Sequence, residues 1–290
     1  MGCLISLLLL GPLCGPGQPL YGENMVKLSS TIGPVDAGII QLLTNTYEKK
    51  SGIKVTFEAA GTWATLEKAK TGNFDLVIVH ARSLEDKFIN DGYGMERRDI
   101  MYNDFVILGP KDDPAKIKGT KTAVEAFAKI ATFAETNANT TKFVTRGDQS
   151  GTHVKELEVW NKAGLSPDSE KNKWYLTFEE GNRGNAHTTL FANSINAYTL
   201  MDRATYIIQK NNISLTILLG NDTVLINYIA SILVNPEKFP NVNSRGAKDF
   251  VDWLCGDEAQ TIIRDFEVEK YHEPLFFPNS NEWNKSHKKV

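Results

Sequence analysis

Short apolar runs alternate with amphipathic stretches along the chain after Met25. The apolar runs, such as residues 74–80 and 226–234, are typical of strands that are buried within a sheet. Stretches with apolar residues at helical spacing, such as residues 154–163, lie between them. We therefore predict an α/β fold in which strands and helices alternate. The predicted strands are residues 26–28, 54–59, 74–80, 101–109, 142–144, 195–200, 215–219 and 226–234, and the predicted helices are residues 37–50, 64–70, 123–135, 154–163, 203–210 and 247–254.

Hydroxyl-bearing residues recur where a predicted strand is followed by a predicted helix. They occupy residues 29–31, residues 61–62 and the segment TRGDQSGT at residues 145–152. In doubly wound sheets, ligands bind beyond the carboxyl ends of the strands, where such junctions lie. The three junctions are therefore candidate parts of one binding site.

The order of the predicted elements fits two lobes better than a single sheet. Residues 25–105 together with residues 222–290 are predicted to form the first lobe, and residues 106–221 the second. The cleft between the two lobes would then receive the hydroxyl-bearing junctions.

A signal peptide is predicted at residues 1–24. Its apolar run at residues 4–10 is too short to span a bilayer, and Gly- and Pro-rich small residues follow the run, as in secretory signals. The usual basic start is missing, because no Lys or Arg precedes Lys27. We expect an extracytoplasmic protein after removal of this segment.

The composition restricts the partners and the means of stabilisation. A net charge of -3, from 32 basic and 35 acidic residues, gives no broad basic field, so we expect no nucleic-acid partner. Removal of the signal peptide would leave Cys255 as the single cysteine, so no internal disulfide could form. Four Asn-x-Ser/Thr sequons are compatible with an exported protein, and they lie at Asn139, Asn212, Asn221 and Asn284.

The segment TRGDQSGT allows three interpretations. Its Arg-Gly-Asp tripeptide could be an exposed adhesion signal. Ser150 could be a nucleophile, although a nucleophile elbow needs Gly-x-Ser-x-Gly and the preceding glycine here is displaced by one residue. His153 lies three residues further on, so a Ser-His-Asp arrangement stays open at this point. The third interpretation is a site for a small anion.

The sequence lacks the motifs for metal or nucleotide chemistry. It contains no His-Glu-x-x-His, no cysteine pair of zinc type, no Asp-rich calcium loop and no Gly-Lys-Ser/Thr of a phosphate loop. The five histidines are isolated, and we expect His80, which follows a buried strand, to be a hydrogen-bonded structural residue. We therefore expect no metal site and no cofactor.

The anion interpretation has a direct physical basis. Ser150, Gly151 and Thr152 immediately precede a predicted helix, so their backbone N–H groups are free donors at the positive end of the helix dipole. Gly151 lets the backbone approach a ligand, and Arg146 adds a forked, permanently charged donor. The alternative that Ser150 or Thr152 only caps the helix stays open at this point. Because three such junctions recur, the implied ligand is a compact dianion held by neutral donors and one arginine.

Several longer segments resemble the tungstate-binding substrate-binding proteins of ABC transporters, members of the type II periplasmic-binding-protein superfamily. The resemblance implies a two-lobed α/β fold of that type, with a mixed sheet flanked by helices in each lobe. It also implies a noncatalytic, monomeric protein that closes on a tetrahedral oxyanion, tungstate or molybdate, and passes it to a membrane permease. Besides TRGDQSGT, the segments are DLVIVHA (75–81), DGYG (91–94), MYNDF (101–105), GPKDDP (109–114), AYTL (197–200) and PLFFP (274–278).

The resemblance also implies a set of ligand contacts. Two departures from the family pattern bear on them: the usual Thr-Thr-Thr-Ser loop is Ser-Thr-Ile-Gly at residues 30–33, and Trp63 replaces the last glycine of the usual Gly-Thr-Gly. Carried over position by position, the contacts are Ser30, Thr31, Thr62, Arg146, Ser150, Gly151 and Thr152.

The pattern Arg-x-Asp-x-Ser-Gly-Thr also resembles the central motif of phosphate-binding proteins of the same superfamily. There, an aspartate matching Asp148 accepts the proton of hydrogen phosphate, which tungstate, molybdate and sulfate lack near neutral pH. Phosphate is therefore the alternative ligand, and a secreted scavenger or sensor without a transporter is the alternative role. The longer matches outside the motif favour tungstate.

Overall fold

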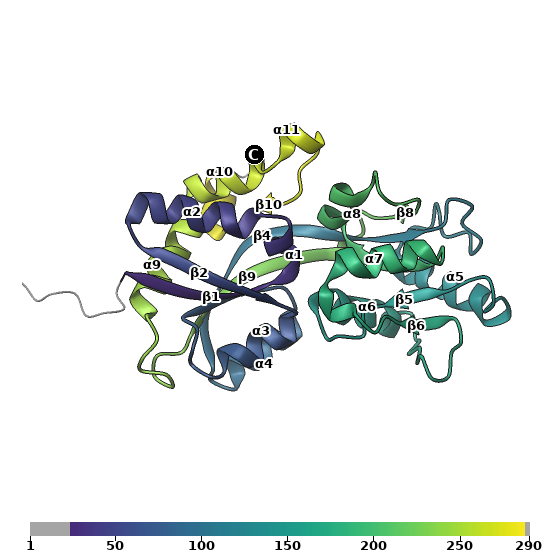
Figure 1. Cartoon of the computed structure of the whole chain (residues 1–290), viewed down its shortest axis with the longest axis horizontal. Coiled ribbons are helices and arrows are strands. Elements are labelled where there is room, and N and C mark those ends of the chain that lie inside the picture. The colour runs from purple at the N-terminus through teal and green to yellow at the C-terminus, as the bar shows by residue number, and fades with distance from the viewer. Residues whose placement is uncertain (1–23, 288–290) are drawn as a thin grey trace, which may run out of the picture.

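The protein, described by a computed structural model over residues 24–287, is built around one path of hydrogen-bonded strands that extends through both of its lobes (Figure 1). The strand order is β2-β1-β3-β9-β4-β7-β5-β6, and β8 and β10 both pair with β4. The strands are β1 (Met25–Thr31), β2 (Lys54–Ala60), β3 (Leu76–Val79), β4 (Gly94–Gly109), β5 (Phe143–Thr145), β6 (Tyr175–Thr177), β7 (Tyr198–Asp202), β8 (Thr216–Leu219), β9 (Ile226–Val234) and β10 (Phe277–Pro278).

Helices cover the sheet of each lobe (Figure 1). In the first lobe these are α1 (Ile32–Asp36), α2 (Ile39–Ser51), α3 (Thr62–Ala69), α4 (Arg82–Asn90), α9 (Ser244–Cys255), α10 (Asp257–Asp265), α11 (Val268–Tyr271) and α12 (Asn281–Ser286). In the second lobe they are α5 (Ala123–Thr136), α6 (Gly151–Lys162), α7 (Asn185–Ser194) and α8 (Arg203–Gln209), with the 3-10 turns η1 (Gly181–Arg183) and η2 (Thr223–Leu225).

The sheet in each lobe is mixed. In the first lobe β1 pairs in parallel with β2 and β3, and β3 pairs antiparallel with β9. In the second lobe β5 pairs in parallel with β6 and β7, and β7 pairs antiparallel with β4. The predicted fold class, a mixed sheet flanked by helices in each of two lobes, is confirmed. The exact residue boundaries of the lobes stay a prediction.

Two long strands carry the chain between the lobes. β4 pairs with β9 as far as Asp104 and then with β7 from Phe105 onward, so its partner changes within one residue step. β9 begins at Ile226 and brings the chain back into the first lobe. The crossing point of β4 and β9 therefore lies between the two lobes, as Figure 1 shows.

Each lobe has its own apolar core. Leu28, Ile78 and Phe250 belong to the largest core cluster of the first lobe. Phe127 and Trp160 lie in the second core, where their ring centroids are 4.2 Å apart. Burial of such large apolar side chains is the main favourable contribution to folding, so each lobe has a core of its own to hold its half of the site in shape.

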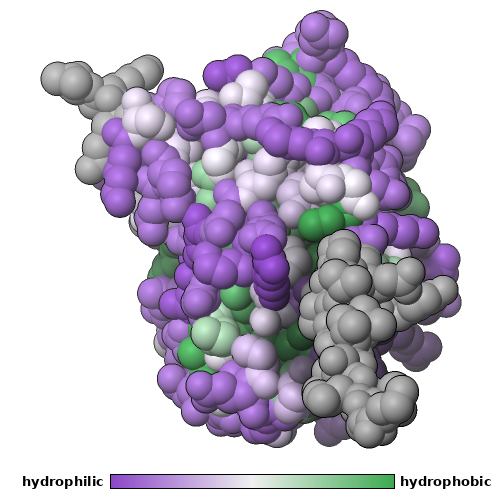
Figure 2. Space-filling view, turned by 90° about the vertical axis from the view of Figure 1, so that its left-hand side faces the viewer, coloured by the Kyte–Doolittle hydropathy of each residue, from purple (hydrophilic) through white to green (hydrophobic). Residues whose placement is uncertain are grey.

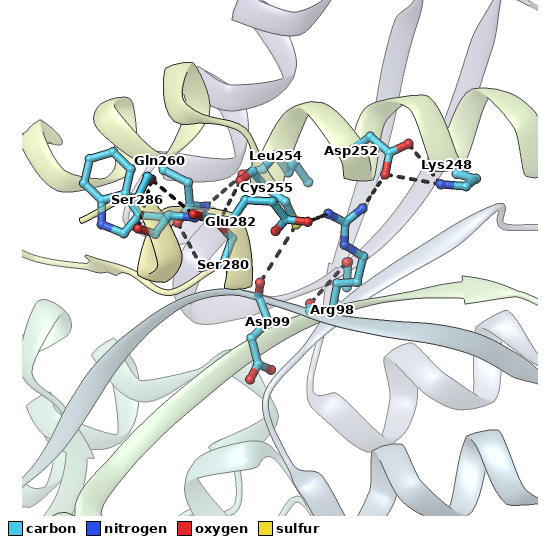
Figure 3. Close-up of polar contacts among 12 residues, drawn as sticks. Arg98, Asp99, Lys248, Asp252, Leu254, Cys255, Gln260, Ser280, Glu282 and Ser286 are labelled. Carbon is cyan, nitrogen blue, oxygen red and sulfur yellow. Dashed lines mark hydrogen bonds and ion pairs between the residues drawn. The ribbon is translucent and has the colours of Figure 1, made fainter. Parts of the chain in front are cut away.

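Side-chain contacts attach the C-terminal segment to the first lobe (Figure 3). Arg98 of β4 forms ion pairs with Asp252 of α9 and with Glu282 of α12, the latter at 2.6 Å. The Ser280 hydroxyl donates to the backbone oxygen of Cys255 at 2.7 Å. The end of the chain is therefore held beside the strand that crosses to the second lobe.

The helix predicted at residues 37–50 is wrong in its bounds. The helix there is α2, which begins at Ile39, and a further short helix, α1, precedes it; Gly38 adopts a left-handed backbone with φ of 91° and separates the two. As a result, the hydroxyl run at residues 29–31 ends strand β1, and α1 begins directly after it at Ile32. The strand predicted at residues 195–200 begins only at Tyr198, because α7 extends to Ser194.

The face of the molecule at the end of the first lobe is largely polar. Figure 2 views the end of the first lobe, where most of the visible surface is hydrophilic and apolar patches are small. Within residues 24–287, none of the helices combines the length and the apolar character needed to cross a bilayer. The predicted signal peptide lies outside the described residues, apart from Asn24.

Candidate functional site

A small cavity lies where the two lobes meet at the crossing of β4 and β9. Thr31 and Thr62 of the first lobe line it, together with Arg146, Ser150 and Asn185 of the second. Its volume is about 20 Å³, which is room for about one or two water molecules. The cavity can therefore hold only a compact ligand.

The first-lobe wall of this cavity is made of hydroxyl groups that have no protein partner. Thr31 ends β1 and Thr62 begins α3, and their side chains are 1% and 0% exposed. Their hydroxyl oxygens make no hydrogen bond, and neither do those of Ser29 and Ser30 beside them. A buried polar group without a partner costs about 1–3 kcal/mol. The two that line the cavity, Thr31 and Thr62, therefore indicate that a ligand completes this wall.

Arg146 is the cation on the second-lobe wall. It is 6% exposed, and three of its N–H groups donate within the protein: Nε to the Gly181 oxygen at 3.2 Å, Nη1 to Asn185 Oδ1 at 2.8 Å and Nη2 to Asp148 Oδ2 at 2.6 Å. Since a guanidinium carries five N–H groups, two are left for a ligand. Burial lowers the pKa of Arg146 and Asp148 opposes this shift, and an arginine stays charged at neutral pH.

Asn185, the first residue of α7, joins several parts of the second-lobe wall. Its Oδ1 also accepts from the Thr152 hydroxyl at 3.0 Å, and its Nδ2 donates to Asp202 Oδ2 at 2.5 Å. Asp202 in turn caps α8, because its Oδ1 accepts from the backbone N–H of Thr205 at 2.8 Å. The second-lobe wall is therefore already held in one arrangement by its own hydrogen bonds.

Asp148 neutralises Arg146 and lies outside the set of residues that line the cavity. Besides its contact with Arg146, it accepts at Oδ1 from the backbone N–H of Ser150 at 3.1 Å. Both of its oxygens are thus engaged by protein donors. The charge of the arginine is balanced locally, so a bound anion would be held mainly by hydrogen bonds and dipoles.

Ser150 serves as the N-cap of α6 and also lines the cavity. Its Oγ accepts from the backbone N–H of His153 at 3.3 Å, which confirms the capping interpretation. The N–H groups of Gly151 and Thr152 belong to the first turn and have no carbonyl partner within the helix. The positive end of this 12-residue helix therefore points toward the cavity.

The structure brings four of the seven predicted contacts to one cavity: Thr31, Thr62, Arg146 and Ser150. The other three lie behind this lining. Ser30 is buried next to Thr31, Thr152 donates to Asn185, and Gly151 lies against His80 of the first lobe. Trp63 is 44% exposed and is not among the lining residues.

Five polar residues of the lining were not predicted as contacts from the sequence. Asn103 on β4 and Asn227 on β9 face each other in register, and Asn227 Nδ2 donates to Asn103 Oδ1 at 2.7 Å. A local signal existed only for Asp202, which directly precedes a predicted helix as an N-cap residue does. The full set is His80, Asn103, Asn185, Asp202 and Asn227.

His80 differs from the structural role expected for it. Its Nδ1 is buried without a hydrogen-bond partner, and the residue lines the cavity. Burial lowers its pKa from 6.5 to about 4, so the ring is neutral at physiological pH. His80 therefore adds no positive charge to the cavity.

Two interpretations of TRGDQSGT are not supported by the geometry. The Arg-Gly-Asp tripeptide is wrong as an exposed signal, because Arg146 is buried and paired with Asp148. His153 is not placed to activate Ser150, since its Nδ1 accepts from the Gln149 N–H at 3.0 Å while its own backbone N–H donates to Ser150. In the described part of the chain, no group of three or more metal-binding side chains could hold a metal ion.

The fold and the cavity define a two-lobed ligand-binding protein whose site is built from hydrogen-bond donors. Residues 22–258 match the PBP superfamily domain, and the chain belongs to this family.

The chain is similar over most of its length to proteins named for tungstate. It is 36% identical to the tungstate-binding protein TupA of Peptoclostridium acidaminophilum, over 92% of this chain and 90% of that protein. A crystal structure of the tungstate ABC transporter from Geobacter sulfurreducens is 41% identical, with a TM-score of 0.74, over 85% of this chain and all of that one. The tungstate-binding protein TupA from Desulfovibrio alaskensis G20 is 34% identical, with the same TM-score, over 89% and 99% of the two chains. These similarities confirm the resemblance that the sequence motifs indicate.

Proposed function

We propose that this protein binds a fully deprotonated tetrahedral oxyanion, tungstate or its near twin molybdate, and delivers it to an ABC transporter. The observation that carries the proposal is the set of free donors around one compact cavity. The unpartnered hydroxyls of Thr31 and Thr62 lie on one side, and two free N–H groups of Arg146 lie on the other. A tetrahedral oxyanion presents four oxygens, each of which accepts hydrogen bonds, and so matches donors that converge from both lobes.

The state of the carboxylates favours an oxyanion without a proton over hydrogen phosphate. A bound hydrogen phosphate needs an acceptor for its O–H group. Asp148 and Asp202 are the carboxylates hydrogen-bonded to Arg146 and Asn185, and each already accepts from protein donors at both of its oxygens. Neither carboxylate is thus left free to accept from an O–H group, which favours tungstate, molybdate or sulfate over phosphate.

A binding role accounts for the site better than an enzymatic one. The Ser150 hydroxyl accepts from the backbone N–H of His153 and caps α6, and its neighbour Arg146 is held by three protein acceptors. A strongly held, water-poor set of donors lowers the free energy of a bound anion without supplying a nucleophile or a proton acceptor.

The names of the relatives and the predicted signal peptide support a transporter partner. Relatives at 34–41% identity are named as tungstate-binding proteins or as a tungstate ABC transporter. We propose that the protein works as an extracytoplasmic monomer that passes its anion to a membrane permease. A secreted scavenger with the same site but no permease is the alternative role.

Isothermal titration calorimetry of the purified protein with tungstate, molybdate, sulfate and phosphate tests the proposal. We expect tungstate and molybdate to bind most tightly and phosphate most weakly. Absence of heat with all four anions would overturn oxyanion binding, and tightest binding of phosphate would replace tungstate by the alternative ligand.

The variant Asp148→Asn further tests whether the ligand is tungstate or hydrogen phosphate. If Asp148 only balances Arg146, the substitution changes the affinities of all four anions by a similar factor and keeps their order. A selective loss of phosphate binding would show that Asp148 accepts the proton of hydrogen phosphate.

A further inference from the structure

The two lobes approach each other closely where His80 meets Gly151. His80 follows β3 in the first lobe, and Gly151 begins α6 in the second. A Cβ atom at position 151 would lie 2.2 Å from both Nδ1 and Cε1 of His80 and 2.6 Å from its backbone oxygen. These separations are far below van der Waals contact, so only glycine allows the lobes to approach this closely.

His80 also separates the cavity from a larger groove outside it. His80 and Asn227 are shared between the lining of the cavity and the lining of this groove, which has a volume of about 810 Å³. The groove is bounded by residues of both lobes, among them Arg82 and Val154. The His80 ring is therefore part of the partition between the buried cavity and the outside.

A ligand in the cavity could not exchange with solvent while this partition is in place. Thr31, Thr62, Arg146, Ser150 and Asn185 are each at most 7% exposed. Some contact between the lobes must therefore open for an anion to enter or leave.

We propose that the contact between His80 and Gly151 is the gate of the cavity, and that the oxyanion enters and leaves through the outer groove when this contact separates. The inference rests on the proposed function, because it assigns a route to the same anion. On this proposal, His80 and Gly151 determine how fast and how fully the two lobes close around the anion.

Two other glycines near the cavity also lie at contacts between the lobes, and the room for an added Cβ differs among the three positions. At Gly184, before α7, an added Cβ would lie 2.9 Å from Cγ2 of Ile32 in the first lobe. At Gly61, before α3, it would lie 3.6 Å from Asp148 Oδ2 and from Ser150 Cβ in the second lobe, an ordinary contact distance. The steric demand is therefore greatest at Gly151, where part of the obstacle is backbone that cannot rotate away.

The neutral state of His80 suits this position. Burial and the charge of Arg146 lower its pKa, while Asp202 raises it, and the result is about 4. A neutral ring can pack against the positive end of α6, whereas a charged imidazolium would be repelled there.

Stopped-flow fluorescence with sodium tungstate tests the gate through the rates of binding and release. Gly151→Ala should prevent full closure and weaken tungstate binding by about ten- to a hundredfold, mainly through faster dissociation. Gly61→Ala, which meets only ordinary contacts, should weaken tungstate binding less than Gly151→Ala does. Gly256→Ala is the matched control, because Gly256 precedes α10 far from the site and has a φ of -80° that alanine adopts freely.

His80→Ala is a second and independent test, because it removes a side chain rather than adding one. Opening the partition should speed both association and dissociation of tungstate, by about tenfold for dissociation. A residue with a purely structural role would not raise the association rate. His287→Ala on the exposed C-terminal helix serves as the control.

The outcomes distinguish the gate from the proposed function itself. Small-angle scattering should show that tungstate lowers the radius of gyration of the wild type. The decrease should be smaller for Gly151→Ala. If the wild type binds none of the four anions, the proposed function fails. If the wild type binds tungstate and His80→Ala leaves both rate constants unchanged, the gate is wrong while the function stands; this holds even if Gly151→Ala does not fold.

Discussion

The two halves of the site are built in opposite ways. In the first lobe, the hydroxyls of Thr31 and Thr62 are buried without any protein partner. In the second lobe, Arg146, Asn185 and Asp202 are joined by hydrogen bonds of 2.5–2.8 Å. One half is neutral and lacks partners within the protein, and the other is charged and joined by its own hydrogen bonds.

Because of this difference, the first-lobe hydroxyls should contribute mainly to anion affinity and the second-lobe network to the stability of the ligand-free protein. A hydroxyl that has no partner contributes nothing favourable to the ligand-free fold, so its energetic value appears only when an anion accepts its hydrogen bond. A group within the second-lobe network stabilises the fold before any ligand arrives. Substitutions in the two halves should therefore leave different signatures in unfolding and in binding.

The largest expected effect is at Arg146. Arg146→Ala removes the only cation of the site among the described lining residues and leaves Asp148 buried without its partner. We expect tungstate affinity to fall by about 2–5 kcal/mol and the free energy of unfolding to fall as well, measured by calorimetry and by urea unfolding. Arg146→Lys, which keeps the charge but loses the fork, should give an intermediate affinity. Unchanged affinity in the alanine variant would remove Arg146 from the site.

A buried carboxyl group in the second lobe should make stability depend on pH. Glu156 of α6 accepts from Trp160 Nε1 at 3.0 Å and from the Tyr175 hydroxyl at 2.7 Å, and burial raises its pKa from 4.5 to about 7. Between these values the unfolded chain releases a proton that the folded protein retains. The stability is therefore unaffected below about pH 4.5, and it falls as the pH rises to about 7.

Glu156→Gln tests this pH dependence by urea unfolding on both sides of that range. Relative to this variant, the wild type should lose about 3 kcal/mol of unfolding free energy as the pH rises. Parallel pH profiles for the two proteins would contradict the raised pKa. The first-lobe hydroxyls do not titrate here, so Thr62→Val serves as the control and should keep the wild-type profile.

Matched Thr-to-Val substitutions compare the two halves directly. Thr31→Val and Thr62→Val remove hydroxyls that have no protein partner, so each should weaken tungstate binding by about 1.5–3 kcal/mol without lowering the stability of the ligand-free protein. Thr152→Val removes the donor to Asn185 and should destabilise the ligand-free protein by about 1 kcal/mol. Equal losses of stability in all three variants would erase the distinction between the halves.

The smallest expected effect is at Trp63, next to Thr62 in the first lobe. Its side chain is 44% exposed and does not line the cavity, so Trp63→Ala should change tungstate affinity by less than about 0.5 kcal/mol. A larger loss, measured by calorimetry, would mean that this residue closes over the anion. That result would also show that the replacement of the last glycine of Gly-Thr-Gly by Trp63 affects anion binding.

Local patterns in the sequence were sufficient to predict much of the fold and part of the site. The buried strand runs, the alternation of strands with helices and the hydroxyls at their junctions all depend on neighbours within a few residues. The segment TRGDQSGT follows β5 and leads directly into α6, so Arg146 and Ser150 could be identified from it. Short helices with weak apolar patterning, such as α7, could not.

The partners of these residues were not predictable, because they come from distant parts of the chain. Arg146 binds Asn185, which lies 39 residues away, and Asn227 binds Asn103 across 124 residues. Neither asparagine carries a local pattern that marks it, since an isolated amide is equally suited to a turn or to a surface. Only the crossing of β4 and β9 and the start of α7 bring them to the cavity.

The sequence by itself determined the fold class, the junctions that bear donors and the cation at Arg146, because backbone and side-chain preferences act locally. The tertiary structure decided which of those donors stay free. It pairs Asp148 with Arg146, caps α6 with Ser150 and places His80 against Gly151, while Thr31 and Thr62 are left without partners. Whether a donor is satisfied depends on every group packed around it, and that environment exists only once both lobes have folded and met.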